Sequence, residues 1–141
     1  MAFVVGAILA LSVGLSASII GFDRDRAFYP IVMIVIASYY ALFAVMGGSI
    51  EVLALESVVI AAFIVTSIAG FKHSLWLVVA ALLAHGVFDV SHNNIILNHG
   101  VPTWWPHFCL AVDVVAGLYL AWLLKTNRLR SRDNNTMRPN G

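Results

Sequence analysis

The chain has 141 residues, of which 61% are hydrophobic and only 11% are charged. A soluble domain is about 45–50% apolar and about 25% charged. This composition, with a mean hydropathy of +0.92, excludes a soluble enzyme, a disordered chain and a nucleic-acid-binding module. The single cysteine, Cys109, excludes an intramolecular disulfide and a thiolate-rich zinc site. The sequence therefore predicts an all-α integral membrane protein, and its net charge of +1 hides an uneven distribution of charge.

Five apolar segments reach or approach the length of about 20 residues that a helix needs to cross a bilayer. They cover residues 2–22, 28–46, 50–71, 75–93 and 105–124. We expect one helix bundle over residues 1–124, followed by a basic, disordered tail at 125–141. The first segment has an alternative interpretation as a cleaved signal peptide, because small residues at 16–18 suit a peptidase. No basic residue precedes it and arginines follow it directly, which favours a retained span.

The positions of lysine and arginine predict how the bundle is oriented. With five spans, the loop after the first span, the loop after the third span and the C-terminal tail share one side of the membrane. All eight Lys and Arg residues fall there: Arg24, Arg26, Lys72, Lys125, Arg128, Arg130, Arg132 and Arg138. The sequence thus predicts an exoplasmic N-terminus, a cytoplasmic C-terminus and a location in the bacterial inner membrane, with membrane lipids as partners. Trp104 and Trp105 suit the exoplasmic interface.

Acidic residues inside the spans carry most of the functional information. They are Glu51, Glu56, Asp89 and Asp113. An ionised carboxylate at the centre of a membrane helix costs about 2.5–3.5 kcal/mol, and no Lys or Arg lies within a span to offset that cost. The only bases available there are three histidines: His85, His92 and His107. The carboxyl groups must therefore be protonated, hydrogen-bonded to histidine or neutralised by a bound cation.

The spacing of the polar residues predicts a metal site in the exoplasmic half of the bundle. His85, Asp89 and His92 stand at i, i+4 and i+7, within about 60° of one helix face. Glu51 and Asp113 lie in the exoplasmic halves of other spans and can complete the ligand set, as in bundles that build carboxylate-rich metal sites from facing helices. Imidazole and carboxylate ligands suit a divalent ion such as Zn, Fe or Mn. We also expect Glu51 or Asp113 to be catalytic, as a general base.

Other interpretations of these residues stay open. Asp89 and His85 can form a structural hydrogen bond, and Glu51 can be an acid favoured by the dipole at a helix start. Glu56 lies about 140° around the helix from Glu51, so both cannot face one site. Glu56 is thus the weakest candidate, with a contact to a second chain as one role. A residue such as Cys109 is more often a small buried apolar group than a ligand.

The polar segments resemble a family of small bacterial integral membrane proteins of uncharacterised function. That family shows a Gly-Gly turn followed by Glu, a span with W-L-x-H-x-x-W-D-x-x-H, a loop with proline and a span with C-x-x-x-D. The matching segments here are 47–51, 82–92 and 109–113, and the likeness covers about residues 26–122. The chain departs from the pattern with Phe88 in place of Trp and with Asn93 where a second His often follows. The resemblance supports the choice of site residues and implies no reaction.

These observations favour a metal-dependent intramembrane enzyme that acts on a hydrophobic or lipid-like substrate reaching the site from the outer leaflet. A metal-free enzyme with a protonated acid as catalyst is an alternative. A cation or proton transporter would use the same residues, although the cytoplasmic halves of the spans offer few polar side chains. A homo-oligomer, or a small accessory subunit of a larger membrane complex, would fit the short chain and the glycine and alanine on several helix faces.

Overall fold

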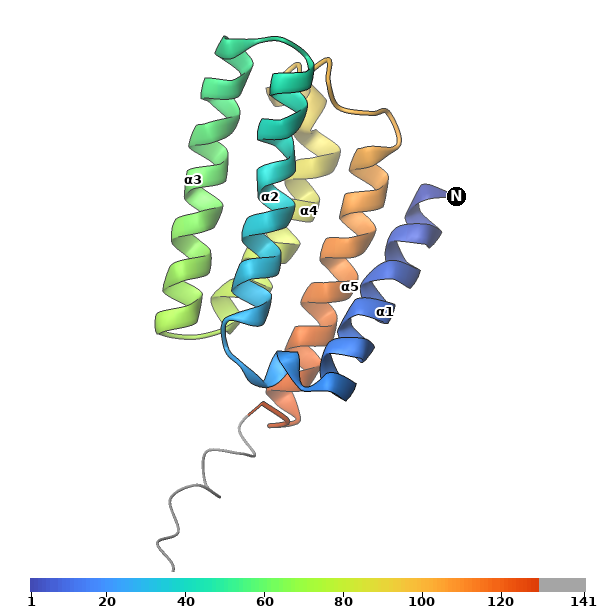
Figure 1. Cartoon of the computed structure of the whole chain (residues 1–141), viewed down its shortest axis with the longest axis vertical. Helices are drawn as coiled ribbons and strands as arrows, with labels where there is room; N and C mark the ends of the chain where they lie inside the picture. The colour runs from blue at the N-terminus through green and yellow to red at the C-terminus, as the bar shows by residue number, and fades with distance from the viewer. Residues whose placement is uncertain (130–141) are drawn as a thin grey trace, which may run out of the picture.

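The structure is a computed structural model that describes residues 1–129, and it contains five α-helices (Figure 1). The helices are α1 (Ala2–Ile20), α2 (Phe28–Met46), α3 (Ile50–Lys72), α4 (Trp76–Ile95) and α5 (Trp105–Lys125), and a short 3₁₀ turn, η1 (Phe22–Arg24), follows α1. No strand occurs within residues 1–129. The all-α prediction is confirmed, and each predicted segment corresponds to one helix whose ends differ by two residues or fewer. Residues 130–141 of the predicted tail lie outside the described part of the chain.

Four of the helices, α1, α2, α3 and α5, are long and apolar enough to cross a membrane. The helix α4 is less apolar because one of its faces carries polar side chains, which are buried within the bundle. The helix α1 buries small residues and exposes large apolar ones, the reverse of a helix in a soluble protein. Its buried residues are Gly6, Ala10, Gly14 and Ala17. Large apolar side chains of the same helix are exposed, among them Phe3, Ile8 and Leu15. Such a surface suits contact with lipid and not with water.

The polar helix α4 is the central element of the bundle. It packs against α5 on one side and α3 on the other, and it also contacts α2. The helix α2 packs mainly against α3, and α1 packs along α5 at the edge of the bundle (Figure 1). Polar side chains of α4 are therefore within reach of partners from three other helices.

The edge helix α1 is attached to α5 at both of its ends. Near the N-terminus, Gly6 lets the two backbones approach, since a Cβ atom there would overlap the carbonyl oxygen of Phe108. Near the other end, Ser18 donates a hydrogen bond to Asp23 of η1, and its Oγ lies 2.8 Å from the hydroxyl oxygen of Tyr119. These contacts hold α1 along α5 and leave its large apolar residues facing outward.

The Lys and Arg residues within 1–129 all lie at one end of the bundle, where α1, α3 and α5 end and α2 and α4 begin (Figure 1). They are Arg24, Arg26, Lys72, Lys125 and Arg128. At this end the guanidinium of Arg26 donates hydrogen bonds of 3.2 and 3.3 Å to the carbonyl oxygen of Phe71. The bundle is therefore basic at one end, and the opposite end has no Lys or Arg among the described residues.

Candidate metal centre

The polar face of α4 points into the bundle, as its spacing predicted. His85 and Asp89 are each 1% exposed, and His92 is fully buried. A helix that contacts α2, α3 and α5 can bury three polar side chains only if its neighbours supply partners for them. Those partners form two groups, one between α4 and α5 and one between α4 and α3.

Between α4 and α5, one imidazole, one thiol and two carboxyl groups gather. Nδ1 of His85 lies 2.8 Å from Oδ2 of Asp113 and 3.5 Å from Oδ2 of Asp89. Cys109 lies one turn before Asp113 on the same face of α5. One ligand atom from each of these four residues lies within 4.8 Å of the others, and all four side chains are buried. We refer to His85, Asp89, Cys109 and Asp113 as the metal group.

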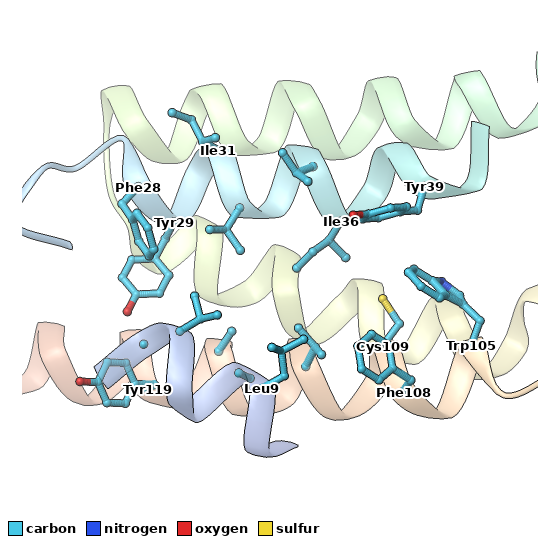
Figure 2. Close-up of a pocket in the computed structure, with 17 residues that line it drawn as sticks. Leu9, Phe28, Tyr29, Ile31, Ile36, Tyr39, Trp105, Phe108, Cys109 and Tyr119 are labelled. Carbon is cyan, nitrogen blue, oxygen red and sulfur yellow. The ribbon is translucent and has the colours of Figure 1, made fainter. Parts of the chain in front are cut away.

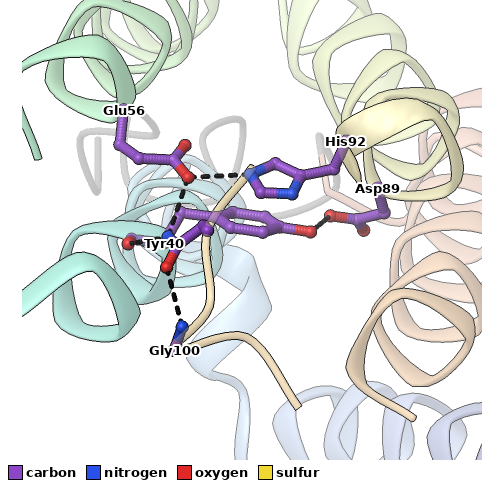
Figure 3. A network of polar contacts seen from close by, with 6 residues as sticks. Tyr40, Glu56, Asp89, His92 and Gly100 are labelled. Carbon is purple, nitrogen blue, oxygen red and sulfur yellow. Dashed lines mark hydrogen bonds and ion pairs between the residues drawn. The ribbon is translucent and has the colours of Figure 1, made fainter. Parts of the chain in front are cut away.

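Between α4 and α3, a second buried pair forms. Nε2 of His92 lies 2.7 Å from Oε1 of Glu56 (Figure 3). The side-chain amide of Asn98 donates to the same oxygen at 2.9 Å. A carboxylate oxygen has two lone pairs and can accept a hydrogen bond from each of these two groups. The amide of Asn98 also donates to the backbone oxygen of Tyr40 at 3.3 Å, and its oxygen accepts from the N–H of Gly100 at 3.1 Å.

The loop after α4 brings Asn98 to this pair because it passes very close to α2. A Cβ atom on Gly100 would overlap the carbonyl oxygen of Phe43. Only glycine fits at this position without moving the backbone. The close approach places the amide of Asn98, which is 4% exposed, between α2 and α3.

Tyr40 of α2 connects the metal group to the second pair. Its hydroxyl donates a 2.6 Å hydrogen bond to Oδ1 of Asp89 (Figure 3). Its ring stacks on the imidazole of His92, with centroids 4.2 Å apart and planes inclined by 22°. Contacts therefore extend from Asp113 on α5, through α4 and α2, to Glu56 on α3, and the stacking of Tyr40 on His92 is the link that is not a hydrogen bond or an ion pair.

The charges of these residues do not balance. Three carboxyl groups face two imidazoles, and no Lys or Arg is buried among residues 1–129. Four buried side-chain atoms of the network lack a hydrogen-bond partner: Oε2 of Glu56, Oδ2 of Asp89, Nδ1 of His92 and Oδ1 of Asp113. Buried carboxylates without such compensation are costly, so this network requires bound protons or a bound cation.

The structure brings together most of the residues that the sequence singled out as metal ligands. His85, Asp89 and Asp113 meet in the metal group. His92 lies on the same face of α4 but contacts Glu56, so it is joined to the metal group through Tyr40.

Glu51, predicted as a metal ligand or general base, is not brought together with His85, Asp89 and Asp113 in the structure. Its side chain is exposed in the first turn of α3. The turn begins at Ser49, whose Oγ accepts a hydrogen bond from the N–H of Val52 at 3.2 Å, and an acid there is favoured by the helix dipole. Glu56, the acid ranked weakest from the sequence, is fully buried and occupies the inner face of α3 instead.

Besides Glu56, sequence reasoning underrated or missed three participants: Cys109, Tyr40 and Asn98. Cys109 could have been identified as a site residue, because it stands four residues before Asp113 and so shares its helix face. Tyr40 lies in an apolar span, where a tyrosine is ordinarily part of the packing. Asn98 lies in a loop, and no periodicity predicts where a loop side chain points.

An apolar crevice lies beside the metal group, between α1, α2 and α5 (Figure 2). Its volume is about 430 Å³, within the range of roughly 300–1,000 Å³ for ligand pockets. Aliphatic and aromatic side chains line it, including Leu9, Ile31, Ile36, Phe108 and Tyr119. Cys109 is part of the lining as well, so the thiol of the metal group borders the crevice.

No family model, no curated protein and no solved structure matches this chain. Its function is therefore inferred from the chemistry of its own residues.

Proposed function

We propose that the chain is an integral membrane protein of five spans in a bacterial inner membrane, with an exoplasmic N-terminus and a cytoplasmic C-terminus. The basic end of the bundle supports this orientation. As the fifth span, α4 has 20 residues, which extend about 30 Å at 1.5 Å per residue, and neighbouring helices cover its polar face. In this orientation Glu56, Asp89 and Asp113 lie within about 12 Å of the exoplasmic ends of their helices.

We propose that the metal group binds one divalent cation. The observation that carries this proposal is the gathering of four buried ligands, whose ligand atoms lie within 4.8 Å of one another, in a network with more carboxyl groups than bases. Oδ2 of Asp89, which lies 3.5 Å from Nδ1 of His85, and Oδ1 of Asp113 make no hydrogen bond. Thiolate, imidazole and carboxylate are the ligands of zinc in proteins, and the thiol of Cys109 favours Zn or Fe over Mn.

We propose further that the metal group is the catalytic centre of an enzyme acting on a hydrophobic or lipid-like substrate. A substrate in the crevice would reach Cys109 without leaving the membrane. A bound divalent ion would supply Lewis acidity toward a carbonyl or phosphoryl oxygen. Since Glu51 is remote, we assign the general base to Asp113, because one of its oxygens is unpartnered and His85 holds the other.

The direction of the polar contacts argues against a conduit as the main alternative. They extend across the bundle from α5 to α3 at similar depths along the helices, and not along its length. An accessory subunit of a larger complex stays an open prediction, as does membership of the family that segments 47–51, 82–92 and 109–113 resemble.

Elemental analysis of the detergent-purified full chain tests the metal. We expect close to one Zn or Fe atom per wild-type chain, and none in His85→Ala or Asp113→Asn. His107→Ala is the matched control, because His107 is exposed and is not in the metal group. Size-exclusion profiles of all four proteins show whether each variant is folded.

Each other outcome has a definite meaning. A wild-type protein that carries no metal after purification without chelators, or variants that retain it, would contradict the metal proposal and leave a protonated hydrogen-bond network. Ion flux through liposomes containing the metal-loaded protein would favour a transporter. A second subunit that copurifies in a fixed ratio would favour the accessory role.

A further inference from the structure

We infer that the crevice between α1, α2 and α5 binds one acyl chain of an outer-leaflet lipid, and that an ester or amide carbonyl of this lipid lies beside the metal group. The role of this lipid as a substrate rests on the proposed function. Its binding in the crevice rests on the shape and lining of the crevice alone.

The crevice is long and runs along the helices. Its lining residues on α5 extend from Trp105 to Tyr119, a separation of about 21 Å at 1.5 Å per residue. On α2 they extend from Phe28 to Tyr39. A cavity of about 430 Å³ that is this long must be narrow, which suits one extended hydrocarbon chain better than a compact ligand.

The crevice is open to the hydrocarbon region of the membrane. Four of its lining residues are exposed apolar side chains at the facing edges of α1 and α2: Leu9, Val13, Ile31 and Val35. Its floor includes Cys109 and Ala116 of α5, which are buried. An acyl chain that passes between α1 and α2 would therefore reach the floor over an apolar surface throughout, which costs little because lipid tails and these side chains are equally apolar.

Two lining residues have a buried polar group without a hydrogen-bond partner, the hydroxyl of Tyr29 near the start of α2 and the indole N–H of Trp105 at the start of α5. Trp105 lines the crevice, and its Nε1 is buried without a hydrogen-bond partner. A buried indole N–H normally has an acceptor. Trp105 lies at the exoplasmic end of α5, one turn before Cys109 on the same face. A carbonyl group just below a lipid head group would accept from this N–H and lie next to the metal group.

Of these two groups, Trp105 is the one that lies one turn from Cys109 of the metal group, and this sets the direction of the lipid. The carbonyl end lies near Trp105 and Cys109, and the chain extends from there toward Tyr119 (Figure 2). A lipid oriented in this way belongs to the exoplasmic leaflet, because Trp105 begins α5 at the end opposite the basic residues.

Photocrosslinking with a defined lipid tests the inference. The probe is phosphatidylethanolamine with a diazirine midway along one ester-linked acyl chain, in vesicles of phosphatidylethanolamine and phosphatidylglycerol. We expect label on the buried floor residue Ala116, mapped by peptide mass spectrometry. Leu118, exposed on the same helix and outside the crevice, reports labelling by bulk lipid.

Filling the crevice should remove the label from its floor. Val112→Trp adds bulk to the floor, and Val35→Trp does so at the exposed edge, where a larger side chain is less of a threat to folding. We expect both variants to lose most of the label on Ala116 and to keep that on Leu118. Val45→Trp is the control, because Val45 is exposed on α2 and does not line the crevice.

The carbonyl contact is tested with an ether-linked probe of the same length. We expect the ester probe to label Ala116 more strongly than the ether probe in wild type, and Trp105→Phe to abolish this difference. A general loosening of the fold would change both probes alike and would not produce this result. Equal labelling by the two probes in wild type would overturn the assignment of the carbonyl.

The same samples separate this inference from the proposed function. Label on Leu118 without label on Ala116 would overturn binding in the crevice, even in a protein that carries metal. Label on Ala116 in a protein that carries no metal would support binding in the crevice and contradict the metal-dependent enzyme.

Discussion

Replacing Tyr40 with phenylalanine removes one hydroxyl from the centre of the polar network and keeps the aromatic ring. This hydroxyl donates to Oδ1 of Asp89 at 2.6 Å, and both residues are 1% exposed, so water cannot readily replace it. Oδ2 of Asp89 already lacks a hydrogen bond. Leaving a buried acceptor unsatisfied costs about 1–3 kcal/mol, and losing a contact that orients a metal ligand lowers metal affinity about 10–100-fold.

Two measurements check this prediction. The free energy of unfolding of the metal-free protein comes from SDS titration in mixed micelles, and the Kd for Zn²⁺ comes from competition with a chromogenic chelator. Tyr39→Phe is the matched control, since Tyr39 is exposed and its ring packs on Trp105. We expect weaker zinc binding in Tyr40→Phe only. Equal affinities in the two variants would show that the contact with Asp89 does not orient a metal ligand.

Three further substitutions test other parts of the structure. Glu56→Gln should lower the free energy of unfolding by about 1–3 kcal/mol, because the partner of a buried imidazole changes; Glu51→Gln should leave it unchanged in the same SDS titration. Gly6→Ile should destabilise the protein by about 1–3 kcal/mol through overpacking against Phe108, and a smaller change would refute the close packing of α1 on α5. Cys109→Ser should weaken Zn²⁺ binding much more than Mn²⁺ binding in chelator competition; an equal effect on both ions would show that the thiol is not a ligand.

The helices and the polar face of α4 could be predicted from the sequence for a simple reason. Each helix is one long apolar segment bounded by polar residues or glycine, so its limits depend on local composition. A helix turns by about 100° per residue, so the spacing of His85, Asp89 and His92 determines that they share a face. Burial of that face follows because polar side chains in an apolar segment face away from lipid.

The partners of that face could not be predicted in the same way. Spacing shows that Glu51 and Glu56 lie on different faces of α3, but it does not show which face turns toward α4. That choice depends on how α3 packs between α2 and α4. The position of Asn98 depends on the close approach of Gly100 to α2, which is a tertiary contact without a sequence pattern.

The charges of the buried side chains show how the metal group and the pair of His92 and Glu56 can be stable without a buried lysine or arginine among residues 1–129. The hydrogen bond between His92 and Glu56 allows a protonated imidazole to balance one carboxylate. Asp89 and Asp113 share only His85, which can balance one more carboxylate if it is protonated. A divalent cation would offset both carboxylates and leave His85 free to bind through a nitrogen lone pair, and Cys109 would bind as the thiolate, releasing its proton as the cation enters. A lysine or arginine in this position would compete with the cation, so the buried network of residues 1–129, which contains neither, suits the metal binding that we propose.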